Sequence, residues 1–163
     1  MTASSLDRFR QAQSRRFAGF ATALDEIRSG GKQGHWIWYV FPQLEGLGTS
    51  GMAQKYGIRG AGEAREYLLD PELGARLLTI TEAVAAQARD GVSLRTLMGS
   101  EIDVVKVVSS LTLFGQVARQ LHANGSEAFG RMAALAEELL AVAAAEGYPS
   151  CRFTLARLQE SHP

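Results

Sequence analysis

The sequence predicts an all-α protein, a single compact domain of six to eight helices with at most a minor short strand. Helix start signals and glycine stops recur along the chain, and such signals bracket helices of ordinary length. Between them, apolar residues repeat every three or four positions, which is the period of an amphipathic helix. One segment alone could be a strand, and no second strand is evident to pair with it.

The first predicted helix begins at Ser5 or Asp7 and has an apolar inner side that includes Phe17. It ends at the glycine pair after Ser29, because glycine readily adopts the left-handed conformation found at helix ends. We expect residues 1–5, which precede it, to be frayed.

Residues 35–43, HWIWYVFPQ, form the densest aromatic cluster in the chain. Alternation would make a short strand with Trp36 and Trp38 on one side, whereas a continuous apolar run also suits a buried helical turn. We favour a helix or irregular structure. Pro42 ends the segment in either case, because proline disfavours the helical conformation of Phe41.

The rest of the chain predicts helices joined by short loops. The strongest start signal is Asp70 followed by Pro71, an N-cap before proline at the first helical position. A short terminal helix is expected within residues 148–163, in the one domain that spans residues 1–163. The other predicted segments are approximately Gly51–Tyr56, Ala61–Leu69, Asp70–Ala88, Ser93–Met98, Glu101–His122 and Ser126–Glu146.

The composition argues against several classes of protein. The 17 Lys and Arg residues are balanced by 17 Asp and Glu residues, so there is no strong signal for nucleic-acid binding. A single cysteine, Cys151, excludes an internal disulfide and a cysteine-based zinc site. The histidines lack metal-ligand spacing, and we expect no metal and no cofactor. Apolar runs are far shorter than the roughly 18 residues of a membrane-spanning helix, and no signal peptide is evident. We therefore expect a cytoplasmic protein that does not act on membranes. The sequence does not predict its oligomeric state.

Asp103 and Lys106 share one face of the central predicted helix, opposite its valine-rich side. Ser100 and Asp103 form a capping box at the helix start, Ser110 lies on the same face, and Ser109 lies at its edge. Solvated helix faces usually carry long charged side chains, whereas this face is mostly small and hydroxylic. We expect a ligand, or another segment of the chain, to approach it closely.

Two interpretations of Asp103 and Lys106 stay open. Their spacing suits an ordinary surface pair worth roughly a few tenths of a kcal/mol, or Asp103 simply completes the cap. Alternatively, both are catalytic: Asp103 orients a hydroxyl or a water, and Lys106 binds a phosphate as a point charge. Ser109, Ser110 and Thr112 could donate hydrogen bonds to the same ligand or bond back to the preceding helical turn.

The glycine-rich loop of residues 46–51, GLGTSG, exposes backbone N–H groups before a predicted helix, and such a place can bind an anion. It matches neither a Walker loop nor a dinucleotide fingerprint. A lone histidine and tryptophans in an apolar run are more often structural, although indole rings also stack on bases. The predicted ligand-binding residues are His35, Trp36, Trp38, Gln43, Gly48, Ser50, Tyr56, Ser109, Ser110 and Thr112.

Four stretches of the chain resemble the bacterial and fungal family called domain of unknown function 1810, some members of which carry the label calpastatin. They are Leu6–Gln13, Ala23–Ile58, Tyr67–Leu77 and Asp103–Phe114. The resemblance implies a mainly α-helical single domain and no settled biochemical activity.

A more remote resemblance is to the NADAR (YbiA-like) proteins, which are mainly helical and act on N-glycosidic bonds of ribosylated or ADP-ribose-like compounds. It implies N-glycosidase-like hydrolysis, with Asp103 as base or cation stabiliser. Val104 departs from the pattern, because NADAR proteins have tryptophan there. The matching residues are Ala53, Ile58, Arg59, Ala61, Glu63, Ala64, Asp103 and Lys106.

Two functions of different kinds follow. In the first, the loop of residues 46–51 meets the face of Asp103 and Lys106 in a cleft that binds or hydrolyses a small phosphorylated or ribosylated ligand. In the second, the protein is a non-catalytic interaction or structural module that uses the aromatic cluster of residues 36–41 to hold a peptide. Burial separates them, because a peptide surface requires exposed rings.

Overall fold

The computed structural model describes residues 4–160, and within that range the chain is all-α, with ten α-helices, one 3₁₀ turn and no strand. The fold class is confirmed, although the helices outnumber the predicted six to eight. The nearest approach to a sheet is a single parallel bridge between Leu44 and Ile58. Of the residues expected to fray, 1–3 lie outside the described residues, whereas the Ser5 hydroxyl donates a 2.7 Å hydrogen bond to Glu63.

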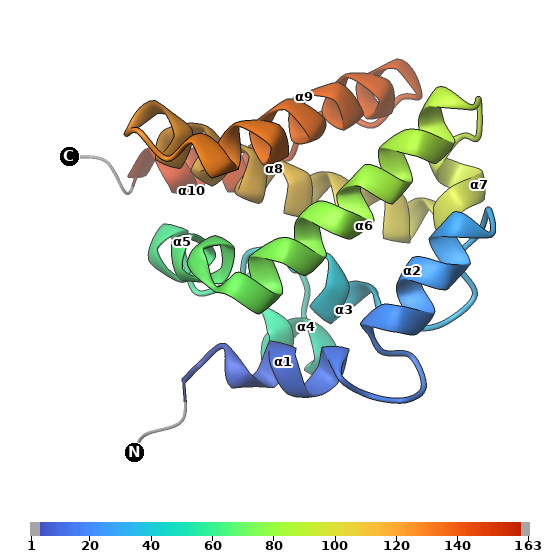
Figure 1. The fold of residues 1–163 in the computed structure, drawn as a ribbon, viewed down its shortest axis with the longest axis horizontal. Helices are drawn as coiled ribbons and strands as arrows, with labels where there is room; N and C mark the ends of the chain where they lie inside the picture. The colour runs from blue at the N-terminus through green and yellow to red at the C-terminus, as the bar shows by residue number, and fades with distance from the viewer. Residues whose placement is uncertain (1–3, 161–163) are drawn as a thin grey trace.

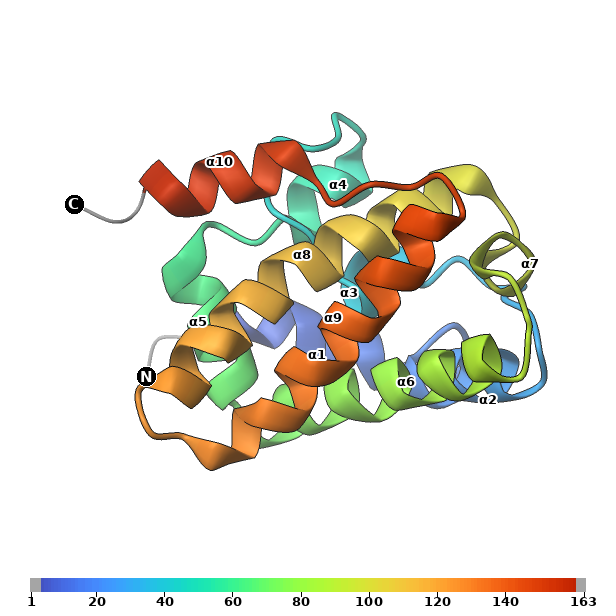
Figure 2. The same cartoon turned by 90° about the horizontal axis from the view of Figure 1, so that it is seen from above.

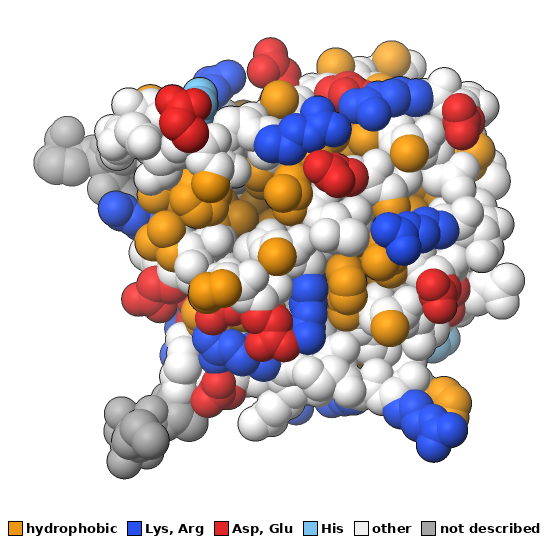
Figure 3. Space-filling view, viewed as in Figure 1, with side chains coloured by type: hydrophobic (Ala, Val, Ile, Leu, Met, Phe, Trp, Pro, Cys, Tyr) orange, Lys and Arg blue, Asp and Glu red, His pale blue; other side chains and the backbone are white. Residues whose placement is uncertain are grey.

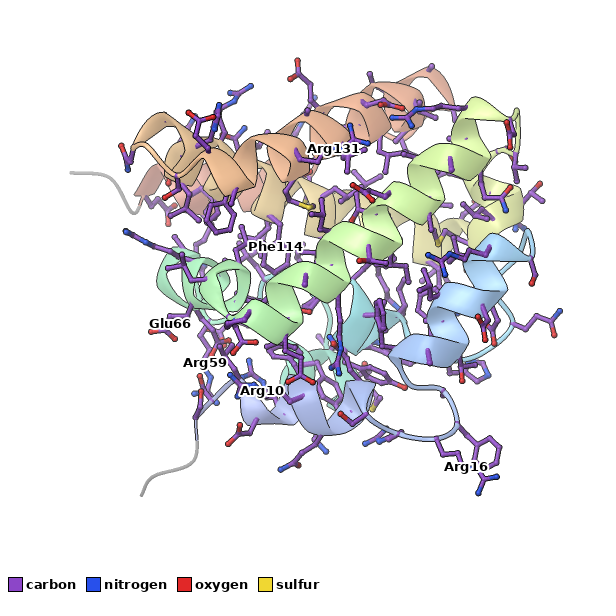
Figure 4. The ribbon with its side chains drawn as sticks, viewed as in Figure 1. Arg10, Arg16, Arg59, Glu66, Phe114 and Arg131 are labelled. Carbon is purple, nitrogen blue, oxygen red and sulfur yellow. The ribbon has the colours of Figure 1, made fainter. Side chains whose placement is uncertain are left out.

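The first predicted helix is in fact two, α1 (Asp7–Gln13) and α2 (Phe20–Arg28). Ala18 between them is left-handed, with φ of 55°, a conformation that no continuing helix allows. Its carbonyl accepts a hydrogen bond from the Tyr39 hydroxyl. The break turns Phe17 outward, with 79% of its surface exposed, so its predicted inner position is wrong. Its neighbour Arg16 points away from the body of the molecule (Figure 4).

The later helices follow their predicted start signals. The Asp70 carboxylate accepts hydrogen bonds from the N–H groups of Glu72 and Leu73, and the Ser100 hydroxyl accepts one from that of Asp103. These caps satisfy amide groups that the first helical turn leaves unpaired. The remaining elements are α3 (Ile37–Val40), α4 (Gly51–Tyr56), α5 (Ala61–Leu69), α6 (Pro71–Arg89), α7 (Leu94–Met98), α8 (Glu101–Ala123), η1 (Glu127–Phe129), α9 (Gly130–Ala145) and α10 (Arg152–Glu160).

Helix α8 is the central element of the domain. It packs against α5 and α9, and also contacts α3, α7 and α10, so it runs through the middle of the molecule (Figures 1 and 2). Phe114 of α8 is fully buried and its ring lies 5.0 Å from that of Tyr67 on α5. Because other helices surround α8, Ser109, Ser110 and Thr112 are all buried, whereas Ile102 and Val105 are exposed.

The aromatic cluster forms the short helix α3 and the turn that follows it. The rings of Trp36, Tyr39 and Phe41 are buried, and only Trp38 is half-buried. After this cluster, the Ile58 N–H donates to the Gln43 carbonyl, and the Glu45 N–H donates to the Ile58 carbonyl, both at 2.9 Å. These two bonds join the ends of the segment that contains the glycine-rich loop and α4.

The surface carries charges of both signs. On the face shown in Figure 3, Lys and Arg side chains alternate with Asp and Glu side chains. No helix in residues 4–160 has both the length and the apolar composition needed to cross a membrane.

Two helical glycines make a matched test of the packing. A Cβ atom at Gly74 of α6 would lie 2.3 Å from the Leu68 carbonyl oxygen, whereas one at Gly62 of α5 would meet no atom within 4 Å. We expect Gly74→Ala to lower the free energy of unfolding by about 2 kcal/mol, as overpacking does. Gly62→Ala should raise it by about 0.5 kcal/mol, because alanine favours the helix. Urea unfolding measures both, and a neutral Gly74→Ala would contradict the α5–α6 contact.

Candidate functional site

A hollow of about 440 Å³ lies where the glycine-rich loop meets the first turns of α8. The loop contributes residues 47–50 to its wall. Helix α8 contributes Ile102, Val105, Lys106 and Ser109, and the remaining wall is formed by Trp38, Gln43 and Ala53. The structure thus places a cleft at the predicted meeting of loop and helix, although its walls differ in part from the predicted ones.

The loop takes its shape from its own hydrogen bonds. The Ser50 hydroxyl accepts a 3.1 Å hydrogen bond from the Ala53 N–H and so starts α4, while the Gln54 side-chain amide donates to the Thr49 carbonyl at 2.9 Å. Gly48 lies so close to α4 that a Cβ atom there would be 2.8 Å from the Ala53 Cβ. The loop therefore needs a glycine at this position, and the neighbouring Thr49 and Ser50 line the hollow.

Lys106 is the cation of the hollow. Its Nζ atom lies 4.8 Å from the centre of the Trp38 ring, a cation–π distance, and 3.7 Å from Asp103 Oδ1. The other oxygen of that carboxylate, Oδ2, is 2.7 Å from Lys32 Nζ. Two lysines thus share one carboxylate, and the hollow has a net positive charge on this side.

Lys32, the partner of Asp103, belongs to the loop between α2 and α3. Its backbone N–H donates a 2.8 Å hydrogen bond to the Leu97 carbonyl, and its Nζ atom lies 5.3 Å from the centre of the buried Trp36 ring. The side chains of Lys32 and Asp103 are only 7% and 15% exposed. At this burial the pair is stronger than an exposed one, because water screens it less.

Glu26 of α2 holds the Lys32 loop in place. Its Oε1 atom accepts hydrogen bonds from the backbone N–H groups of Gln33 and Gly34, both at 2.8 Å, and from the Trp36 indole at 2.9 Å. Burial raises the pKa of the Glu26 carboxyl, but these hydrogen bonds, together with nearby Lys32, outweigh burial and hold its pKa below the usual value.

The structure brings some predicted site residues together and leaves others apart. The hollow itself is lined by Trp38, Gln43, Gly48, Ser50, Lys106 and Ser109. Tyr56 lines an adjoining space of about 10 Å³, which is about the size of one water. The predicted residues outside the hollow are Asp103, His35, Trp36, Ser110 and Thr112.

The residues outside the hollow have different surroundings. Asp103 is paired with Lys32, and the Trp36 ring is fully buried. Thr112 donates a 2.7 Å hydrogen bond back to the Val108 carbonyl and accepts one from the Cys151 N–H. Ser110 is fully buried, and its hydroxyl has no partner in the part of the chain that the structure describes. His35 is exposed, away from the wall of the hollow.

Ser109 combines both predicted behaviours. It bonds back to the Val105 carbonyl at 3.0 Å and also lines the hollow. Sequence reasoning missed the apolar wall, where Ile102 and Val105 are 68% and 52% exposed. It also missed Lys32, for which the GGK stretch after α2 held no distinguishing signal.

A model of the family described as "Protein of unknown function (DUF1810)" matches residues 3–134. The chain belongs to this family. The DUF1810 chain is similar to a solved structure, the conserved hypothetical protein Rv1873 from Mycobacterium tuberculosis, with 35% identity and a TM-score of 0.72. The similarity covers 95% of this chain and 96% of that one. No curated protein matched the chain. The residues of the hollow all lie inside the family match.

The pH dependence of stability tests how Glu26 holds the site. The pKa of Glu26 is lowered in the folded protein. The carboxylate therefore contributes its full share of the free energy of unfolding above the unfolded pKa of about 4.3, and this contribution is lost as the pH falls through the folded pKa. Glu26→Gln should lower the free energy of unfolding by about 2 kcal/mol at pH 7, and this deficit should shrink below about pH 4.

Urea unfolding at a series of pH values measures this difference. The neighbouring exposed residue serves as a control, and Asp25→Asn should change stability by less than about 0.5 kcal/mol throughout. A Glu26→Gln deficit that does not change between pH 7 and pH 3 would show that the charge of Glu26 is unimportant.

Proposed function

We propose that the hollow beside α8 binds a small phosphorylated or ribosylated molecule, of the nucleotide or ADP-ribose kind. The observation that supports this most is the position of Lys106. It lines the hollow, and the nearest carboxylate, at 3.7 Å, is already paired at 2.7 Å with Lys32. A ligand phosphate would supply the full counter-charge that Lys106 lacks, and lysine binds phosphate well as a point charge.

The other walls suit the rest of such a ligand. Gln43 lines the hollow, and its side-chain amide forms no hydrogen bond with any residue that the structure describes, so it can bind sugar hydroxyls or a base edge. Leu47, Ile102 and Val105 offer apolar surface for a flat ring. A volume of about 440 Å³ is ample, since a cavity of roughly 150 Å³ holds benzene.

The proposal concerns binding, and the geometry favours binding over hydrolysis. N-glycosidic cleavage builds positive charge on the sugar, which a carboxylate facing the ligand would stabilise. Asp103 is outside the wall of the hollow, and its Oδ2 atom is engaged by Lys32. Its role as a catalytic base stays a prediction, and we assign it instead the role of orienting Lys106.

The aromatic cluster gives little support to an interaction module. Trp36, Tyr39 and Phe41 are at most 1% exposed, and rings inside the core offer no surface to a peptide. Trp38 remains partly accessible, but it lies beneath Lys106 in the hollow. These positions favour a small ligand over a peptide on this cluster.

Thermal shift of the intact protein tests the proposal with inorganic phosphate, ribose 5-phosphate, ADP-ribose and NAD. A ligand at 100 times its dissociation constant should stabilise the fold by about 2.7 kcal/mol, a rise of several degrees in melting temperature. Lys106→Ala should weaken binding at least about tenfold, since a charge-assisted hydrogen bond contributes roughly 1.5 kcal/mol or more.

Lys55→Ala is the matched control, because Lys55 is an exposed lysine on α4 outside the wall of the hollow. It should leave both the ligand shift and the unliganded melting temperature unchanged. Equal shifts in the wild type and in Lys106→Ala would refute the proposal, as would the absence of any shift with all four compounds.

A further inference from the structure

A second hollow, of about 240 Å³, lies among α8, α9 and α10. It has no lining residue in common with the hollow beside the glycine-rich loop. We propose that it binds a free α-amino acid with an apolar side chain, held as a zwitterion between Arg119 and Glu137.

The two charges of the hollow are unpaired. Arg119 of α8 and Glu137 of α9 both line it, and both are exposed. Neither forms a hydrogen bond or an ion pair with any residue among 4–160, although the adjacent charges on α9 are paired. Glu138 is 2.6 Å from Arg89, and Arg131, labelled in Figure 4, is 3.3 Å from Glu82. The face of α9 toward α6 is thus neutralised, whereas the face toward α8 is not.

The packing of α8 against α9 gives the hollow its small-residue surface. Helices α8 and α9 meet through small side chains, and a Cβ atom at Gly115 would lie 2.9 Å from the Ala136 Cβ. Ala133 and Ala136 line the hollow, and their short side chains take up little of the space between the helices. Arg119 from α8 and Glu137 from α9 line the same hollow and form no ion pair with each other, so a ligand in the hollow that carries both charges can pair with both.

A free amino acid complements this arrangement. Its carboxylate matches the two parallel N–H donors of an arginine, which bind carboxylates in a bidentate manner, and its ammonium group donates to the carboxylate of Glu137. Gln116 also lines the hollow, and its side chain forms no hydrogen bond within the described chain, so it can bind either end of the ligand.

The apolar part of the ligand has its own surface. Leu140 and Leu155 line the same hollow. Beyond Gln116 and Leu155, which both spaces share, a further hollow of about 140 Å³ continues toward Leu158 on α10. Together the two spaces have room for a side chain such as that of leucine, methionine or phenylalanine. An amino acid without a side chain would leave this apolar surface wet, and so should bind less tightly.

Isothermal titration calorimetry of the full chain tests this with L-leucine, L-methionine and L-phenylalanine. Because both charged side chains are exposed, we expect a modest dissociation constant, on the order of 1 mM or below. L-Leucinamide, which lacks the carboxylate, N-acetyl-L-leucine, which lacks the ammonium group, and glycine should each bind at least tenfold more weakly than L-leucine.

Variants assign each end of the ligand to its partner. Arg119→Gln should bind L-leucine at least tenfold more weakly and should no longer distinguish it from L-leucinamide. Glu137→Gln should likewise lose the distinction between L-leucine and N-acetyl-L-leucine. Arg131→Gln, on the paired face of α9, is the control that should bind as the wild type does, and Lys106→Ala should also bind L-leucine normally.

Absence of binding by all three amino acids at 10 mM would overturn the inference. Equal affinity of L-leucine, its amide and its acetyl derivative would also overturn it, as would variants of Arg119 and Glu137 that bind like Arg131→Gln. Circular dichroism of each variant confirms that the helical fold is retained, which is expected because both side chains are exposed.

Discussion

The ion pair between Lys32 and Asp103 is the interaction on which the candidate site depends. It joins the loop after α2 to the first turn of α8, at 2.7 Å between Nζ and Oδ2 and with little exposure of either side chain. Removing one partner of a buried pair typically costs about 3–5 kcal/mol, because the other charge is left uncompensated. Replacement of this ion pair by uncharged residues would therefore require both residues to change together.

The same pair determines the charge of the hollow. Asp103 completes one strong contact with Lys32 and reaches Lys106 only at 3.7 Å, so Lys106 rests over the Trp38 ring in place of a full counter-ion. Glu26 acts one step further away, because it fixes the backbone of Gln33 and Gly34 next to Lys32. A chain of contacts from α2 to α8 thus sets the electrostatics of a surface that neither helix forms alone.

Sequence periodicity could predict the helices but not all of their faces. The signals around Asp70 and Ser100 act locally, so those helix starts were predictable. At the break, the Ala18 carbonyl accepts a hydrogen bond from the distant Tyr39 hydroxyl, a contact that no local pattern reveals. On α8, the small polar residues were identified as a face that something approaches closely. For Ser110 the approaching group is another part of the chain, because other helices surround α8. This burial is a property of the tertiary structure, which the sequence pattern of one helix does not contain.

The account claims that Lys106 is held ready for a ligand anion because Asp103 is committed to Lys32. A crystal structure of the protein with bound ADP-ribose tests this most directly. We predict a phosphate oxygen within about 3 Å of Lys106 Nζ, the normal hydrogen-bond range, with the Lys32–Asp103 pair intact. A structure in which the ligand phosphate lies elsewhere while Lys106 stays over Trp38, or in which Asp103 leaves Lys32 to pair with Lys106, would contradict it.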